Sequence, residues 1–254
     1  MSLVETPGPI LLIRTIRAEF ARLCTLRSMW VMALLTTIAV VGISMLSAAN
    51  ASAELGQPVW MSIRRLGMLA MAVLLSMATA AATADHGTGG IVPTLQWTPR
   101  RPFLLTGRAI VIVVAVTATG LIPAFVGGML AIGLAPELSW SWGQATEALA
   151  ALGFVFALGA LLAVGVGLLL RSTAASICAV FALVLVLPLL MGNLPFDWTK
   201  DVAALLPGTS MRQLLIGEGL PGLTDTGAKS TLAAWALGAF VVGGWRLVRG
   251  DANG

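Results

Sequence analysis

The chain has 254 residues, of which 58% are hydrophobic and only 10% charged, and its formal net charge at pH 7 is +4. A soluble domain of this length carries about a quarter charged residues, so these charges are too few to cover a water-facing surface. The apolar runs are long and continuous and show no strand-like alternation, which predicts an all-α integral membrane protein rather than a barrel. Basic runs never exceed two residues, so the charge does not indicate nucleic-acid binding.

The first element, at about residues 9–27, is predicted to be an amphipathic interfacial helix. Its apolar residues recur at helical spacing, and most of its charged residues fall on other faces. The apolar set is Ile13, Ile16, Phe20 and Leu23, and the charged set is Arg14, Arg17, Glu19 and Arg22. A basic helix of this kind suits the membrane surface.

A cleaved secretory signal is the alternative for this beginning, because an A-x-A pattern occurs at Ala51–Ala53. The basic region before the first apolar run is nearly thirty residues long, and the run itself has the length of a full span. A signal has a shorter apolar region of 7–15 residues, so we expect this segment to remain as a span.

Six segments are long and apolar enough to cross a bilayer. They are expected at about 29–49, 66–84, 109–133, 148–170, 172–192 and 231–247. Six spans place both termini on one side, and ten of the fifteen basic residues lie on that side. The bias predicts cytoplasmic termini in a multi-pass protein. The Arg- and Ala-rich, Lys-poor composition is typical of a high-GC bacterium, so we expect the bacterial cytoplasmic membrane.

The predicted spans have no ionisable residue at their centres. Ion-driven transporters and intramembrane proteases need such groups at depth, so both classes are disfavoured. With a single histidine, His86, we expect no metal site, and we expect no catalytic residue. Cys24 and Cys178 are expected to be buried small hydrophobic residues.

Small residues recur at four-residue steps, as in the stripe of Gly159, Ala163 and Gly167 and again around Gly42. Such residues let helices approach closely in lipid. Two interpretations stay open, packing within one bundle and a seam between two subunits.

Two outer features complete the pattern. Arg64 and Arg65 are paired at the outer edge of the second span, where they either reach lipid head groups or contact an anionic substrate or lipid at an exit site. The outer cap segment, 192–229, contains two short amphipathic stretches broken at Pro207, which we expect to be partly inserted helices forming a gate or cap.

The segment between spans two and three, 85–108, is far longer than a connection between antiparallel helices requires. Arg100 and Arg101 lie between Pro99 and Pro102, which holds them on a stiff turn. This basic, partly apolar segment either anchors the chain at lipid head groups or docks onto a cytoplasmic partner.

The order of residues here resembles the ABC type 2 permeases, the membrane subunits of ATP-driven exporters. In that family an acidic residue leaves the second span and is followed by Gly-Thr, Thr-Leu, Pro-Arg-Arg and a basic residue before the third span. The corresponding positions are Asp85, Gly87, Thr88, Thr94, Leu95, Pro99, Arg100, Arg101 and Arg108. The resemblance extends along the chain to the basic interfacial helix at about 9–27, called the entry helix below, and to the outer stretch LLPGTSMRQLL. Departures are Asp85, where Glu is commoner, and His86-Gly87 in place of an aromatic–basic pair.

The resemblance implies a permease that pairs with a second, identical or homologous membrane subunit and with two separate ATPase subunits. The segment 85–108 would be the cytoplasmic coupling segment, acting with the entry helix, and a hydrophobic or amphipathic compound (drug, natural product, peptide or lipid) would be exported. The chain lacks the G-x-x-x-x-G-K-[ST] phosphate loop, so ATP and Mg²⁺ would be bound by the partner ATPase and this chain would not be an enzyme.

An alternative from another class is a non-transporting membrane scaffold or immunity protein that holds a cytoplasmic partner. It would keep the same topology without ATP turnover, and the absence of an associated ATPase would identify it.

Overall fold

The computed structural model describes residues 8–49, 59–87, 101–135, 140–217, 219–220 and 222–249, and within these ranges the chain is helical with no strand. The first helices are α1 (Gly8–Thr25), α2 (Arg27–Ala49), α3 (Val59–Gly87), α5 (Arg101–Leu134) and α6 (Trp142–Leu170). The later ones are α7 (Thr173–Phe181), a π-helical turn (Ala182–Val186), α8 (Leu187–Asn193), α9 (Asp197–Ala204), α10 (Pro207–Ile216) and α11 (Asp225–Arg249).

Five stretches in the described part of the chain are long and apolar enough to cross a membrane. They are α2, most of α3, α5, α6 and the continuous stretch Thr173–Asn193 that contains α7 and α8. This confirms the prediction of an all-helical, multi-pass membrane protein. The sixth predicted span lies within α11, which is not one of the five, and it stays a prediction.

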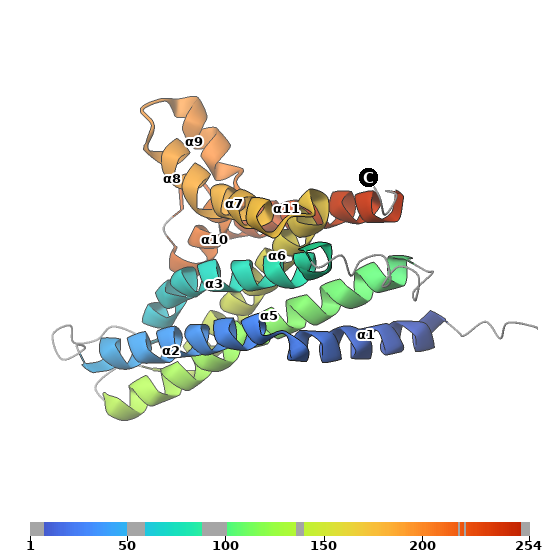
Figure 1. Ribbon diagram of the computed structural model, residues 1–254. Helices are drawn as coiled ribbons and strands as arrows, with labels where there is room; N and C mark the ends of the chain where they lie inside the picture. The colour runs from blue at the N-terminus through green and yellow to red at the C-terminus, as the bar shows by residue number, and fades with distance from the viewer. Residues whose placement is uncertain are drawn as a thin grey trace, which may run out of the picture.

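The bundle is centred on α6, which packs against α3 and α5 and, most extensively, against α11 (Figure 1). Fourteen residues of α6 are buried, including Leu152, Phe156, Leu162 and Leu168. A helix that is apolar all round, as α6 is, belongs in the interior of a helical bundle, because every face requires an apolar neighbour. Helices α1 and α2 run along α5 on one side of α6, α7 packs against α6 and α3, and α8 and α9 project from the body.

Helices α6 and α11 touch at their backbones. A Cβ atom added to Gly165 would lie 2.4 Å from the carbonyl carbon of Ala239, and one added to Gly243 would lie 2.3 Å from the carbonyl oxygen of Gly165. Only glycine fits at both positions, and backbone contact of this kind provides the van der Waals packing that holds helices together in lipid.

The stripe of small residues on α6 packs within the bundle. Gly159 faces Met71 of α3, and Gly167 faces Ala82 of the same helix. Ala163, between them, is fully buried. This favours the first of the two interpretations for this stripe, since its face is already occupied by α3.

The outer segment contains two short helices, and the break between them lies at Leu205 and Leu206 rather than at Pro207, because a proline suits the first turn of α10. Helix α10 is inserted among α3, α6 and α11, and its Met211 and Leu215 are fully buried. Helix α9 instead exposes its large apolar side chains, Trp198 and Val202, and buries only the small Ala203 and Thr199. The prediction for the cysteines was wrong, because Cys24 and Cys178 are free and exposed on helix faces that no other described helix covers.

The α6–α11 contact generates a test. We expect Gly165→Ala to destabilise the protein by about 1–3 kcal/mol, because the added methyl group must displace backbone rather than a flexible side chain. Thermal melting in detergent, followed by fluorescence-detected size exclusion, measures the change. Gly238→Ala on α11 is the matched control, since a Cβ there meets nothing within 4 Å. Equal melting temperatures for the two variants would contradict the close approach.

Candidate functional site

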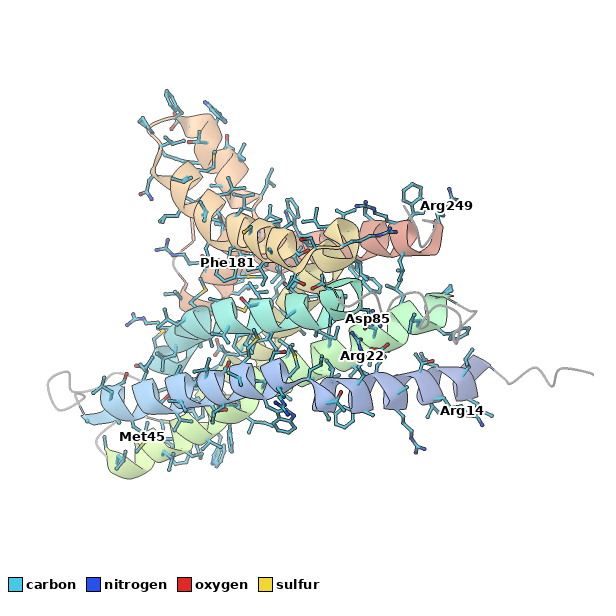
Figure 2. The ribbon with its side chains drawn as sticks, viewed as in Figure 1. Arg14, Arg22, Met45, Asp85, Phe181 and Arg249 are labelled. Atoms are coloured by element: carbon cyan, nitrogen blue, oxygen red, sulfur yellow. The ribbon has the colours of Figure 1, made fainter. Side chains whose placement is uncertain are left out.

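A cluster of four charged side chains lies where α1, α3 and α5 meet. Its members are Glu19 and Arg22 of α1, Asp85 of α3 and Arg108 of α5. Figure 2 shows Arg22 and Asp85 facing each other between these helices. Because the four residues come from three helices, the cluster fixes the relative positions of those helices at one end of the bundle.

Arg108 is the centre of the cluster and is 2% exposed. Its Nε and Nη2 atoms donate to the two carboxylate oxygens of Glu19 at 3.3 and 3.0 Å, which is the two-pronged geometry that suits guanidinium and carboxylate. Its Nη2 also lies 2.5 Å from Oδ2 of Asp85. One arginine side chain therefore joins α5 to both α1 and α3.

Arg22 closes the ring from the other side. Its Nη1 atom donates to Oε2 of Glu19 at 2.9 Å, and its Nη2 atom forms an ion pair with Oδ1 of Asp85 at 2.6 Å. Each carboxylate thus contacts both arginines, and the four formal charges cancel.

The burial of the ring determines how much free energy is lost when one of its ion pairs is broken. Glu19 and Asp85 are 5% and 8% exposed, so neither carboxylate can be hydrated fully if its partners are removed. Breaking a buried ion pair by removing one partner typically costs 3–5 kcal/mol, because the other charge is left uncompensated. Even if apolar side chains could stabilise the fold as well as the ring does, the cost of separating its charges holds the three helices in one arrangement.

The ring also sets which face of α1 meets the bundle. Thr15, Glu19 and Leu23, spaced four residues apart, are the buried stripe. At Gly107 on α5, an added Cβ would lie 2.8 Å from Cγ2 of Thr15, so α1 rests closely on the start of α5.

The apolar set predicted for α1 divides between the bundle and the outside of the protein. Leu23 is buried and Ile16 is half-buried, whereas Ile13 and Phe20 are 54% and 58% exposed, together with Arg14 and Arg17. Because Glu19 faces Arg108, Ile13 and Phe20 stay on a side of α1 that a membrane surface can contact.

Of the residues singled out by the family resemblance, some lie in the ring, some lie at helix ends and the others lie outside the described residues. Asp85 is in the ring, Gly87 is the last residue of α3 and Arg101 is the first residue of α5. Glu19 and Arg22 of the entry helix join Asp85, which the sequence did not indicate. Outside the described residues lie Thr88, Thr94, Leu95, Pro99 and Arg100.

The ring could have been anticipated in part. Arg108 was recognised only as the basic residue that precedes the third span, and its contacts were missed. The signal was that Asp85 and Arg108 are single charges at the ends of apolar segments, where charges are rare unless they are paired, and that Glu19 is the one acidic residue of the basic helix at 9–27.

Arg64 and Arg65, at the opposite end of α3, have separate environments. Arg64 donates from Nη2 to the carbonyl oxygen of Leu214 at 2.6 Å, and its Nη1 lies 3.8 Å from Glu147 of α6. Arg65 is exposed. Arg64 therefore ties α10 to α3, and of the pair Arg65 is the side chain that faces outward.

In the described part of the chain, no three His, Cys, Asp or Glu side chains gather as a metal site would require. The ring itself is an ion-pair assembly whose oxygens are all directed at guanidinium groups, so its chemistry is structural and electrostatic.

No family model matches the chain, and a search of curated proteins finds no match to it.

The ring predicts a large effect of Arg108→Gln. We expect the free energy of unfolding to fall by about 3–5 kcal/mol, because Glu19 loses its main partner and Asp85 one of two. Urea unfolding in mild detergent, followed by tryptophan fluorescence, measures the loss. Arg65→Gln removes the same charge from an exposed position and should change stability by less than about 0.5 kcal/mol. Similar losses in the two variants would contradict the structural role of the ring.

A second test concerns the arginine pair on α3. Arg64→Ala should lower stability by about 1.5–3 kcal/mol, the usual range for a charge-assisted hydrogen bond, whereas Arg65→Ala should have almost no effect. Limited proteolysis after Arg212 then reports on α10, which should be cut faster only in the Arg64 variant. Faster cleavage in the Arg65 variant as well would refute the assignment.

Proposed function

We propose that this chain is the permease subunit of an ABC exporter. The observation that carries the proposal is the ring of Glu19, Arg22, Asp85 and Arg108. It joins the entry helix α1 to the two helices that flank the predicted coupling segment, with Asp85 near the end of α3 and Arg108 in the second turn of α5. A cytoplasmic partner that moved this segment would act on three helices held together by ion pairs.

The mechanical argument follows from where the ring lies. A segment of about two dozen residues, 85–108, leaves and re-enters the bundle at the same charged cluster. Displacement of the segment cannot shift α3 alone, since Arg108 and Arg22 bind Asp85 from α5 and α1. Movement is passed to the bundle as a unit, as a coupling device requires.

The distribution of charge supports a cytoplasmic location for this end. The ring arginines, together with Arg171, Arg246 and Arg249, lie at the ends of helices that the topology places inside, as the positive-inside rule expects. The proposal takes α11 as the sixth span. Its 25 residues are long enough to cross, and it packs along α6 for much of its length.

The proposed energy source follows from what the chain lacks, and the proposed substrate class follows from its apolar helix faces. The chain has no phosphate loop, and the described candidate spans have no ionisable residue near their centres that could carry a coupling ion. ATP with Mg²⁺ would be hydrolysed by two partner ATPase subunits. Apolar helix faces suit export of a hydrophobic or amphipathic compound by this subunit and a second, identical or homologous one.

The proposal is tested by charge reversal in the coupling segment. Arg100→Glu combined with Arg101→Glu should lower co-purification with the ATPase subunit by at least about tenfold, the scale of losing charge-complementary contacts at an interface. The ATPase is the one encoded beside this chain or pulled down with it. Pull-down and ATP hydrolysis in nanodiscs provide the two readouts.

The control is Arg65→Glu combined with Lys229→Glu, which makes the same change in net charge at exposed positions on the other side of the protein. Unchanged ATPase binding in the Arg100/Arg101 variant would show that the segment contacts lipid instead. Failure of the unaltered chain to bind any ATPase would favour the scaffold alternative.

A further inference from the structure

An apolar groove of about 550 Å³ lies between α6, α7 and α11. Its walls are provided by Leu162, Val166, Leu169, Leu170, Ala179, Leu183, Ala234, Trp235, Gly238, Ala239 and Val242. The one polar side-chain atom on this wall, Nε1 of Trp235, already donates to the carbonyl oxygen of Leu205 at 2.7 Å. The lining therefore offers contacts for hydrocarbon and no hydrogen bonds for a polar molecule.

Three arginines surround the cytoplasmic end of this groove. Arg246 donates from Nη1 to the carbonyl oxygen of Leu169, and Arg171 donates from Nη2 to the carbonyl oxygen of Arg246 at 3.3 Å. Arg249 lies over the ring of Trp245 at 5.4 Å from its centre. The two carbonyls belong to the final turns of α6 and α11, so each helix end is capped by a guanidinium from the other.

The charge at this end exceeds what the caps need. Each helix C-terminus carries roughly half a negative charge, and Asp251 follows α11 in the sequence, so about two negative charges are set against three guanidinium charges and about one positive charge remains. The acidic residues of the three groove helices are Asp225, in the first turn of α11, and Glu147, in the second turn of α6, so both lie toward the opposite end. A guanidinium has five N–H donors, so one bond to a carbonyl leaves others for an anion.

We propose that this groove binds an anionic phospholipid of the cytoplasmic leaflet. One acyl chain would lie along α11 against Gly238, where no atom occupies the space next to the backbone, and the phosphate would meet Arg246 and Arg249. Apolar walls with an arginine cluster at the cytoplasmic rim are the combination that recognises an anionic lipid. The inference goes beyond export and uses only the inside orientation of the termini.

Native mass spectrometry of the full chain, purified in mild detergent, tests the site. Phosphatidylglycerol and phosphatidylcholine with identical acyl chains are added separately, and glycerol phosphate is added as a soluble head group. We expect phosphatidylglycerol to bind at least about tenfold more tightly than phosphatidylcholine, the scale expected for two arginines near a lipid phosphate. Glycerol phosphate should neither bind nor compete, because it lacks the chain that fills the groove.

Three variants and one control separate the effect of the groove from the effect of its arginine rim. Gly238→Leu fills the groove and should weaken binding of both lipids at least about fivefold, and Ala234→Leu, which narrows the same wall, should act in the same direction. Gly42→Leu is the matched control, because it also places leucine where a Cβ meets nothing within 4 Å, on α2 away from the groove. Arg246→Gln combined with Arg249→Gln should remove the preference for phosphatidylglycerol while retaining phosphatidylcholine.

The site is refuted if Gly238→Leu and Ala234→Leu bind phosphatidylglycerol as the unaltered chain does, or if glycerol phosphate competes fully. An unchanged lipid preference in the Arg246/Arg249 variant refutes the rim assignment. The measurement needs no ATPase, so it succeeds or fails independently of the exporter proposal.

Discussion

The arrangement of the helices at one end of this protein depends on a buried ring of two arginines and two carboxylates. Arg108 is almost completely enclosed, and it can be so only because Glu19 and Asp85 neutralise it. The ring imposes a geometric condition on three helices at once. Helix α1 must turn Glu19 inward, α3 must end beside α1, and α5 must begin between them. Apolar packing alone would tolerate rotation of a helix about its axis, but a two-pronged ion pair does not.

The rest of the bundle is held by a different kind of contact. Along α6, small residues bring α3 and α11 close, and at Gly165 and Gly243 the backbones themselves touch. Close packing of this kind is required in lipid, where the solvent offers no hydrophobic driving force between apolar helices. The protein thus combines a charged fastening at the α1–α3–α5 end with tight small-residue packing along α6. The ion pairs fix the rotation of each helix about its axis, and the small-residue packing fixes which helix surfaces fit together.

These two kinds of contact hold different sets of helices together. Helices α1, α3 and α5 are joined through the ring, while α11 is joined to α6 through backbone contact and two exchanged arginine caps. Helices α8 and α9 project from the body with extensive exposed apolar surface (Figure 1). The region around the ring is therefore suited to transmit a displacement, and the groove between α6, α7 and α11 is suited to hold a hydrocarbon chain.

The sequence alone determined the class of protein, because twenty-residue apolar runs with few charges have no alternative to membrane helices. It also indicated two short helices in the outer segment from local periodicity, although it placed the break at Pro207, which is the first residue of α10. It did not determine the orientation of α1. Periodicity predicted a membrane-surface helix with Ile13 and Phe20 on its apolar face, but it could not indicate that Glu19 is buried, because that burial depends on pairing with Arg108, 89 positions away on α5. Pairing between distant charges and contact between distant glycines depend on which helices become neighbours, and only the folded chain decides that.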